Sequence, residues 1–396
     1  MVWEENKQQI VQLQEKKQIY LYGAGKNGKE ILFVLKKMRM WLPWDICFLD
    51  QDIKKQMQGV EEYPVMDPKI FFVQQPTDCF VVVTPDGLAG QEIMEMLNQN
   101  LNENIPIFYG FDFLHTVLSL YCFLVHDIVF FASESLLPTT VCNLNCRDCL
   151  NFTPYIQHHY IESFYDLQRD IDVFFSAVDL VYRFQITGGE PLLYQYLEDL
   201  IVYISQTYGK QILRLEMVTN GTILPSDTIC SLLHRYKVHV FLDDYRESLP
   251  NYAVCYETIR KKFIEFGVDF EENLVSQWIQ MYDPNQVYVS FTEEQLCDKF
   301  RLCKNPWSSL RNGKIASCNY AMYAAKAGIC ADTDTEYYDL TQYSSKKKRE
   351  LVAFRLRNFP KGYTEFCKIC NGWTMTNQKW CEPAIQAERK KTNEVE

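Results

Sequence analysis

The strongest constraint on this chain of 396 residues is a set of three closely spaced cysteines near its middle. Cys142, Cys146 and Cys149 are separated by three and then two residues. Three thiolates on one short loop can hold three irons of a four-iron, four-sulfur cluster and leave the fourth iron open for chemistry. A structural zinc site needs a fourth Cys or His at finger-like spacing, and the next candidate is His158. The spacing therefore favours an iron–sulfur cluster, with zinc as the alternative.

A second motif follows further along the chain, where residues 186–191 read Ile-Thr-Gly-Gly-Glu-Pro. The paired glycines Gly188 and Gly189 let backbone amides approach a ligand closely, and Glu190 beside them can hold an ammonium group. The two motifs, in this order, resemble those of the radical S-adenosylmethionine superfamily. The resemblance implies that the three cysteines hold a [4Fe-4S] cluster whose open iron chelates the amino and carboxylate groups of S-adenosylmethionine.

Strands and helices alternate between residues 127 and 290, which predicts a partial (β/α)6 barrel with its site at the carboxyl edge of the strands. Polar residues follow the expected strands at this edge. The resemblance implies that Thr219 and Asn220 contact the ribose or methionine end of the cofactor, and an ordinary Asn-Gly turn is the alternative. Strands are expected up to Val141 and at 180–186, 212–218 and 238–242, with helices at 162–177 and 198–208.

One position departs from the family pattern. Most members carry an aromatic residue just before the third cysteine, packed near the adenine, whereas this chain has Asp148. Phe152 is the candidate replacement, and an adenine held mainly by the backbone is the alternative.

The first third of the chain alternates short apolar strands with helices. This order predicts a Rossmann-like, doubly wound parallel sheet, so the whole chain is of the α/β class. Strands are expected at 18–22, 45–49, 79–84 and 105–108, with helices up to about residue 37 and at 90–98.

A glycine turn, Gly23-Ala-Gly25-Lys-Asn-Gly28, joins the first of these strands to its helix. A turn in this position can place a pyrophosphate on the helix N-terminus, and Asp50 can accept ribose hydroxyls at the end of the second strand. The stretch resembles the small Rossmann-like domains that accompany enzymes of surface-polysaccharide pathways. The resemblance implies a nucleotide or nucleotide-sugar ligand, and a docking module with an ordinary tight turn is the alternative.

The C-terminal part carries a second cysteine pattern, with Asn312-Gly313 as a good hairpin turn inside it. Four thiolates in two pairs can fully ligate a second [4Fe-4S] cluster, and a four-cysteine zinc knuckle is the alternative. The pattern resembles the twitch domain, the shorter relative of the SPASM extension, which implies one auxiliary cluster. Its four cysteines are Cys303, Cys318, Cys367 and Cys370. We expect the others to be buried small side chains: Cys47, Cys79, Cys122, Cys230, Cys255, Cys297, Cys330 and Cys381.

These patterns divide the chain into four parts. We expect a Rossmann-like domain at 1–120, a radical S-adenosylmethionine barrel at 127–290, a twitch domain at 291–385 and a disordered tail at 386–396.

Charge and composition exclude several classes of partner. The formal net charge of −11 argues against binding to nucleic acid or an anionic membrane, which needs a basic surface. Residues 113–131 are rich in apolar side chains but contain His115, His126 and Asp127, which argues against a membrane span. Residues 1–17 have too short an apolar core for an export signal, so we expect a cytoplasmic protein with cysteines as ligands or free thiols.

The resemblances together imply an enzyme. A flavodoxin- or ferredoxin-type reductant supplies an electron, S-adenosylmethionine is cleaved to methionine and a 5′-deoxyadenosyl radical, and the radical takes hydrogen from a substrate carbon. Twitch members act on sugars, aminocyclitols and nucleotides, and residues 142–155, 186–193 and 366–372 resemble radical enzymes of polysaccharide gene clusters. Both resemblances favour a small substrate, either a sugar or a nucleotide-activated glycan building block. A fully ligated auxiliary cluster favours oxidation or elimination over epimerisation through a thiol.

Two rival functions remain at this stage. One is a peptide-maturing enzyme of the same mechanism, whose leader-binding domain is usually a winged helix. The other is a non-enzymatic iron–sulfur sensor or electron carrier, which does not need the motif at 188–190 for a cofactor.

Overall fold

The computed structural model describes residues 2–374 and 377–387. The chain forms two compact units, Met1–Ala132 and Ser133–Glu396. The last part of the tail predicted at 386–396, from residue 388 on, lies outside the described residues. None of the helices in the described part of the chain is long and apolar enough to cross a membrane.

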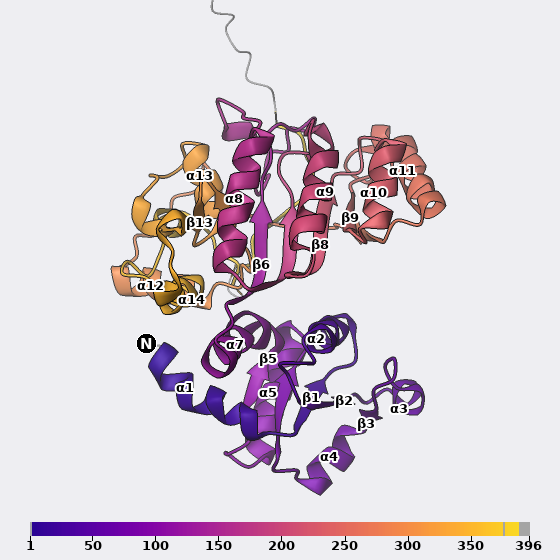
Figure 1. Cartoon of the computed structure of the whole chain (residues 1–396), viewed down its shortest axis with the longest axis vertical. Coiled ribbons are helices and arrows are strands. Elements are labelled where there is room, and N and C mark those ends of the chain that lie inside the picture. The colour runs from indigo at the N-terminus through magenta and orange to yellow at the C-terminus, as the bar shows by residue number, and fades with distance from the viewer. Residues whose placement is uncertain (1, 375–376, 388–396) are drawn as a thin grey trace, which may run out of the picture. The chain divides into compact units, whose positions relative to one another are not determined.

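The first unit is built on a five-stranded parallel sheet with the order β3-β2-β1-β4-β5 (Figure 1). This is the doubly wound sheet that the sequence predicts, with strand and helix bounds within a few residues of those expected. The strands are β1 (Gln18–Tyr22), β2 (Asp45–Leu49), β3 (Val65–Met66), β4 (Cys79–Val83) and β5 (Ile107–Tyr109). The helices are α1 (Val2–Gln12), α2 (Lys26–Lys37), α3 (Ile53–Gln58), α4 (Pro68–Gln74), α5 (Gly87–Asn100), α6 (Gly110–Asp112) and α7 (Leu118–His126).

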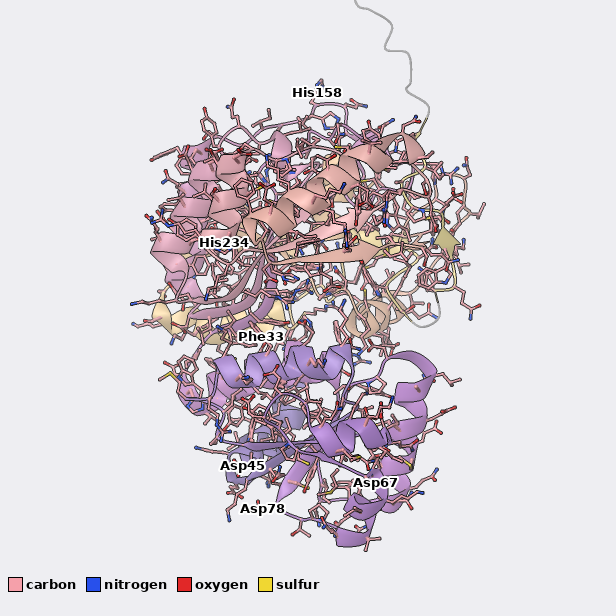
Figure 2. All side chains as sticks on the ribbon, turned by 90° about the vertical axis from the view of Figure 1, so that its right-hand side faces the viewer. Phe33, Asp45, Asp67, Asp78, His158 and His234 are labelled. Carbon is pink, nitrogen blue, oxygen red and sulfur yellow. The ribbon has the colours of Figure 1, made fainter. Side chains whose placement is uncertain are left out.

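The strands of this sheet are apolar along their length, and polar residues mark their ends. All five residues of β4 are buried, as expected for a central parallel strand. Asp45 begins β2 and Asp78 precedes β4, and both mark the amino edge of the sheet (Figure 2). Trp44 packs on Phe80 and Tyr121, with ring centroids 4.8 and 4.9 Å apart. The opposite, carboxyl edge carries the glycine turn and Asp50.

The second unit contains an eight-stranded sheet with the order β10-β9-β8-β7-β6-β12-β13-β14. Its strands are β6 (Phe130–Leu136), β7 (Leu180–Ile186), β8 (Ile212–Thr219), β9 (His239–Asp244), β10 (Phe270–Leu274), β12 (Ser309–Arg311), β13 (Lys314–Ala316) and β14 (Tyr337–Asp339). A separate pair joins β11 (Trp278–Ile279) to β15 (Trp380–Cys381). The helices are α8 (Phe164–Ala177), α9 (Leu197–Tyr208), α10 (Asp227–Arg235), α11 (Ala253–Phe266), α12 (Glu293–Leu302), α13 (Asn319–Lys326) and α14 (Lys348–Arg355).

Helices cover the outer face of the parallel strands, as in a partial barrel (Figure 1). Phe174 and Phe175 of α8 pack on Phe184 of β7, at 5.7 and 5.3 Å between ring centroids. Side chains alternate between the two faces of a strand, so the neighbouring Arg183 and Gln185 lie on the inner face. Both of them donate hydrogen bonds to the buried Glu216 of β8.

Two features of this sheet differ from the sequence expectation. Strand β6 ends at Leu136 rather than near Val141, because residues 139–141 leave the sheet and bond to other loops. The expected strand and helix pattern ran to residue 290, but the consecutive parallel strands end with β10. The sixth strand of the parallel part is β12, which comes from the C-terminal part of the chain and pairs with β6.

The hairpin predicted at Asn312-Gly313 is confirmed. It joins β12 to β13, and both turn residues have positive φ, 53° and 68°. This is the backbone that an Asn-Gly pair adopts readily in a two-residue hairpin. The turn amides of Asn312 and Gly313 donate to the buried carboxylate of Asp170 on α8, at 2.6 and 2.7 Å. The hairpin is therefore tied to the barrel helix.

Candidate functional site

The three cysteines of the first motif lie on one loop, together with the buried Leu144. A C-terminal segment packs on this loop. Arg147 N donates to Ile385 O and Ala387 N donates to Asn145 O, both at 2.7 Å, and Ala384 is 0% exposed. We call residues 384–387 the C-terminal strap. The first residues of the expected disordered tail are therefore ordered against the cysteine loop.

Polar groups surround the sulfurs of this loop. Asn220 Nδ2 lies 3.7 Å from the sulfur of Cys142, and Gln386 Nε2 donates to that of Cys146 at 3.4 Å. Cys149 Sγ lies 3.4 Å from Thr153 Oγ1. Hydrogen-bond donors around thiolate ligands are a common feature of iron–sulfur sites and help to set their potential. The donor set therefore fits a [4Fe-4S] cluster.

Burial raises the pKa of the Cys142 and Cys146 thiols to about 12. An iron ion must therefore displace a proton from each thiol to bind the thiolate. Cluster binding at this loop is expected to release protons.

Glu190 is fully buried at the carboxyl edge of the barrel, with 0% exposure. Its Oε1 accepts hydrogen bonds from Thr219 Oγ1 at 2.9 Å and from Leu192 N at 3.1 Å, and its Oε2 accepts one from Asn220 N at 2.9 Å. Burial raises the pKa of Glu190 to about 7, although these hydrogen bonds act to lower it. A nearby cation would favour the ionised form of this carboxylate at neutral pH.

The backbone after Gly188 bonds to the segment that precedes the first cysteine. The amide of Gly189, which was expected to approach a ligand, donates to Thr139 O at 2.8 Å, and Glu190 N donates to Val141 O at 2.9 Å. A Cβ atom on Gly189 would overlap the Val141 carbonyl. These glycines let the second motif dock on the segment that leads into the first cysteine.

Asn220 joins the two motifs. Its backbone amide binds Glu190, and its side chain lies beside the sulfur of Cys142 and donates to Asn143 Oδ1 at 3.1 Å. Asn143 in turn donates to Thr222 Oγ1 at 2.7 Å. Thr219 and Asn220 thus lie beside Glu190, and their contact with the cofactor stays a prediction. Asn143 is a member of the network that sequence reasoning missed.

Asp243 is a further carboxylate at this edge. It accepts hydrogen bonds from Asn273 Nδ2 at 2.7 Å and from Tyr245 OH at 2.8 Å, and burial raises its pKa to about 6. Its negative charge also acts to raise the pKa of Glu190. Asp243 directly follows the strand expected at 238–242, and the structure extends β9 to include both Asp243 and Asp244.

Phe152 is a buried side chain that lines a small pocket together with Asp148 and Cys149. Its side chain is 4% exposed and packs on Phe366, with ring centroids 5.3 Å apart, and on Tyr282 at 6.3 Å. The ring therefore belongs to the core around the C-terminal cysteines. The expected adenine contact of Phe152 stays a prediction, with a backbone-held adenine as the alternative.

The four cysteines of the second pattern line one cavity: Cys303, Cys318, Cys367 and Cys370. Asn305 Nδ2 donates to Cys318 Sγ at 3.3 Å, and Gly372 N donates to Cys370 Sγ at 3.2 Å. Lys299 Nζ donates to the carbonyl oxygens of Cys367 and Cys370, at 2.8 and 2.5 Å. Four thiols with these donors and a nearby cation also fit an iron–sulfur cluster.

The spare cysteines are dispersed over both units. The Cys255 thiol donates to Thr222 O at 3.3 Å, beside the Asn220 network, and the Cys297 thiol donates to Lys361 O at 3.5 Å. Within residues 2–374 and 377–387, no group of three or more His, Cys, Asp or Glu side chains is arranged to hold a metal ion. A four-iron cluster is a larger group, in which each thiolate binds a different iron.

The N-terminal candidates meet at the carboxyl edge of the first sheet. Asp50 Oδ2 accepts a hydrogen bond from Ala24 N at 2.9 Å, so the carboxylate holds the glycine turn. Gly25 precedes α2, and Gly28 lies buried in its first turn. Gly23 and Asp50 line the same cavity.

Comparison with known proteins finds one family model that matches part of the chain. Residues 136–266 match the model of the Radical SAM superfamily. No curated protein matches the chain.

Several solved structures are similar to parts of the chain. Native anSMEcpe with bound AdoMet is 14% identical over 58% of this chain and 81% of that chain, with a TM-score of 0.41. BtrN in complex with AdoMet and 2-DOIA is 14% identical over 62% and 96%, with a TM-score of 0.36. Streptococcus suis SuiB bound to S-adenosylmethionine is 17% identical over 55% and 46%, with a TM-score of 0.28. The match to anSMEcpe with AdoMet and a Cp18Cys peptide spans 42% of that chain, less than half its length.

The matched residues contain both sequence motifs and the strands β7, β8 and β9 that position them. Radical SAM proteins use a [4Fe-4S] cluster and S-adenosylmethionine. Residues 136–266 of this chain are thus similar to the Radical SAM superfamily.

Proposed function

We propose that this protein is a radical S-adenosylmethionine enzyme that takes hydrogen from a carbon of a sugar or nucleotide-activated glycan building block. The observation that carries the radical chemistry is the Asn220 network, which connects Glu190 to the sulfur of Cys142. A cluster ligand and a buried carboxylate for the cofactor ammonium are thereby held in one rigid arrangement. A sensor or electron carrier has no need of this arrangement.

The residues of the site have distinct roles in this proposal. Cys142, Cys146 and Cys149 hold the first cluster, and Glu190 accepts the methionine ammonium. Thr219 and Asn220 orient Glu190 by hydrogen bonds. When bound, the cluster and S-adenosylmethionine supply a 5′-deoxyadenosyl radical.

The four cysteines around the second cavity hold an auxiliary [4Fe-4S] cluster in this proposal. A cluster with four protein ligands has no open iron, so its service is electron transfer or shaping of the substrate site. This favours oxidation or elimination as the outcome. A flavodoxin- or ferredoxin-type protein is the proposed reductant, and the cytoplasm is the proposed location.

The sugar substrate rests on the resemblance to twitch enzymes and on the neighbouring doubly wound sheet. The first unit is a five-stranded parallel α/β fold rather than a winged helix, which weighs against leader-peptide binding.

Isotope transfer tests the substrate class. The reduced protein is incubated with S-adenosylmethionine and a panel of ring-deuterated nucleotide sugars, and 5′-deoxyadenosine is analysed by mass spectrometry. We expect deuterium in 5′-deoxyadenosine from at least one sugar. Transfer only from deuterated peptides would assign the protein to peptide maturation instead.

The same reaction in deuterium oxide tests the outcome. An oxidised or eliminated product carries no solvent deuterium at the carbon that lost hydrogen. Solvent deuterium at that carbon, lost in a Cys255→Ala or Cys297→Ala variant, would overturn the redox proposal in favour of a thiol hydrogen donor.

A further inference from the structure

Lys299 on α12 places a positive charge at the cavity of the second cysteine set, which consists of Cys303, Cys318, Cys367 and Cys370. Its Nζ donates to the carbonyl oxygens of Cys367 and Cys370, at 2.8 and 2.5 Å. The same nitrogen lies 4.8 Å from the ring centroid of Phe291. In the part of the chain that the structure describes, no Asp or Glu side chain forms an ion pair with Lys299. Its charge therefore faces only carbonyl oxygens and an aromatic ring.

Arg357 is a second cation at this set. Its guanidinium group donates to the carbonyl oxygens of Phe300, Cys303 and Asn305, at 2.6, 2.5 and 2.5 Å. The group also lies over the ring of Phe300, 4.8 Å from its centroid. Within residues 2–374 and 377–387, Arg357 has no carboxylate partner either. The side chain thus holds the backbone on both sides of the first cysteine of the set.

The backbone of Arg357 shows that this placement has a cost. Arg357 follows the end of α14 with a positive φ of 63°. Its amide donates to Phe354 O and the amide of Asn358 donates to Ala353 O, both at 2.9 Å. Helices that end with this pair of bonds usually have glycine at that position, because a Cβ atom makes the left-handed backbone unfavourable. The contacts of the guanidinium group offset this cost.

The surroundings of the first three cysteines differ in charge. Asn220 and Gln386, the side-chain amides beside their sulfurs, are neutral. Arg147 is the one cation in the sequence of the loop 142–149, and it is paired with Asp148 at 3.0 Å. The cations of the second set are not neutralised in this way.

Cations without a carboxylate partner favour an anionic group at a site with four thiolates. Four thiolates give a four-iron cluster a net negative charge, and reduction adds one more. A fixed positive charge nearby attracts the reduced form more strongly than the oxidised form, so it raises the reduction potential. The same attraction offsets the cost of holding cations away from water.

We propose that Lys299 and Arg357 raise the reduction potential of a cluster at the second cysteine set above that of the cluster on the first three cysteines. The inference rests on the auxiliary cluster of the proposed function. It favours electron transfer over shaping of the substrate site as the role of the second set.

Redox titration followed by electron paramagnetic resonance tests this on the full chain. The triple variant Cys142→Ala, Cys146→Ala, Cys149→Ala leaves only the second set to hold a cluster, so its signal is observed alone. In this background, Lys299→Gln and Arg357→Gln should each lower the midpoint potential by about 59 mV or more, a tenfold change in a one-electron equilibrium. In the protein with all its cysteines, the signal shared with the triple variant should have the higher midpoint potential of the two.

Three further variants separate charge from structure. Lys299→Arg and Arg357→Lys keep the positive charge and should keep the potential. Arg301→Gln, on the same helix as Lys299, is the matched control because Arg301 is exposed and paired with Asp298 at 2.7 Å, and it should leave the potential unchanged. If the glutamine variants lose their iron, retention of iron by the charge-keeping variants supports the proposal.

The contrary results are also distinct. An unchanged potential in either glutamine variant, or an equal shift or equal iron loss in its charge-keeping counterpart, would overturn the role of that residue and leave the auxiliary cluster in place. A second cluster reduced at a lower potential than the first would overturn the inference as a whole. A triple variant that holds zinc or no metal would instead overturn the auxiliary cluster of the proposed function, and the inference with it.

Discussion

Glu190 is fully buried, and in the proposal it binds the ammonium group of the cofactor. It accepts three hydrogen bonds, yet desolvation raises its pKa to about 7, so a partner cation would favour its charged form. The ammonium group of S-adenosylmethionine is the proposed partner.

We therefore expect Glu190→Gln to bind S-adenosylmethionine about 10- to 100-fold more weakly, because a charged hydrogen bond contributes about 1.5–3 kcal/mol. Iron content should be unchanged. Equilibrium dialysis of the anaerobically reconstituted protein measures the affinity, and Glu265→Gln, exposed on α11, is the control. Equal affinity in Glu190→Gln would remove the assigned role.

Glu134 on β6 should make the free energy of unfolding depend on pH. It is 0% exposed, and burial raises its pKa to about 8, although Ser308 and Arg355 both act to lower it. The ordinary pKa of Glu is about 4.3, so the folded state holds the proton more tightly than the unfolded state. The resulting stability is complete below about pH 4 and is lost as the pH rises towards 8.

Glu134→Gln should remove this dependence because an amide does not ionise. Between pH 5 and 8 the unfolding midpoint of the unmodified protein should fall more steeply than that of the variant, by the equivalent of about 1–3 kcal/mol. Thermal unfolding at four pH values measures the slopes, with Glu265→Gln as the reference. Parallel slopes for Glu134→Gln and the unmodified protein would contradict the assignment.

At the scale of elements, the C-terminal strap is the least expected part of the fold. It pairs with the cysteine loop through Asn145 and Arg147, and Gln386 donates to the Cys146 sulfur. A hydrogen bond to a cluster sulfur raises the reduction potential by stabilising the added electron.

Gln386→Ala should therefore lower the midpoint potential of the first cluster and speed its loss of iron. Redox titration followed by electron paramagnetic resonance measures the potential, and iron release to a chelator measures the loss. Gln342→Ala, at an exposed position, is the control. An unchanged potential in Gln386→Ala would show that the strap does not act on the cluster.

Elements with a strong local signal could be predicted from the sequence. The bounds of β1, α2, β2 and β7 follow from apolar runs ended by glycine or polar residues, and the Asn312-Gly313 turn follows from its backbone preference. The end of β6 and the strap could not be predicted, because both depend on contacts between segments far apart in the chain. The hydrogen-bond partners of Gly189 and Asn220 could not be predicted for the same reason.

At the scale of the whole molecule, the two cysteine sets lie in separate environments of the second unit. The first loop packs with the strap, and the second set lies in the core that contains Phe152 and Phe366. Each set is proposed to hold one four-iron cluster, so the two should be separable by mutation.

Cleavage of S-adenosylmethionine tests the central claim most directly. The anaerobically reconstituted protein should bind about eight irons and form 5′-deoxyadenosine under reduction, since each cysteine set matches one four-iron cluster. The triple variant Cys142→Ala, Cys146→Ala, Cys149→Ala should keep about half of the iron and form none. A triple variant that still forms 5′-deoxyadenosine would contradict the assignment of the radical site.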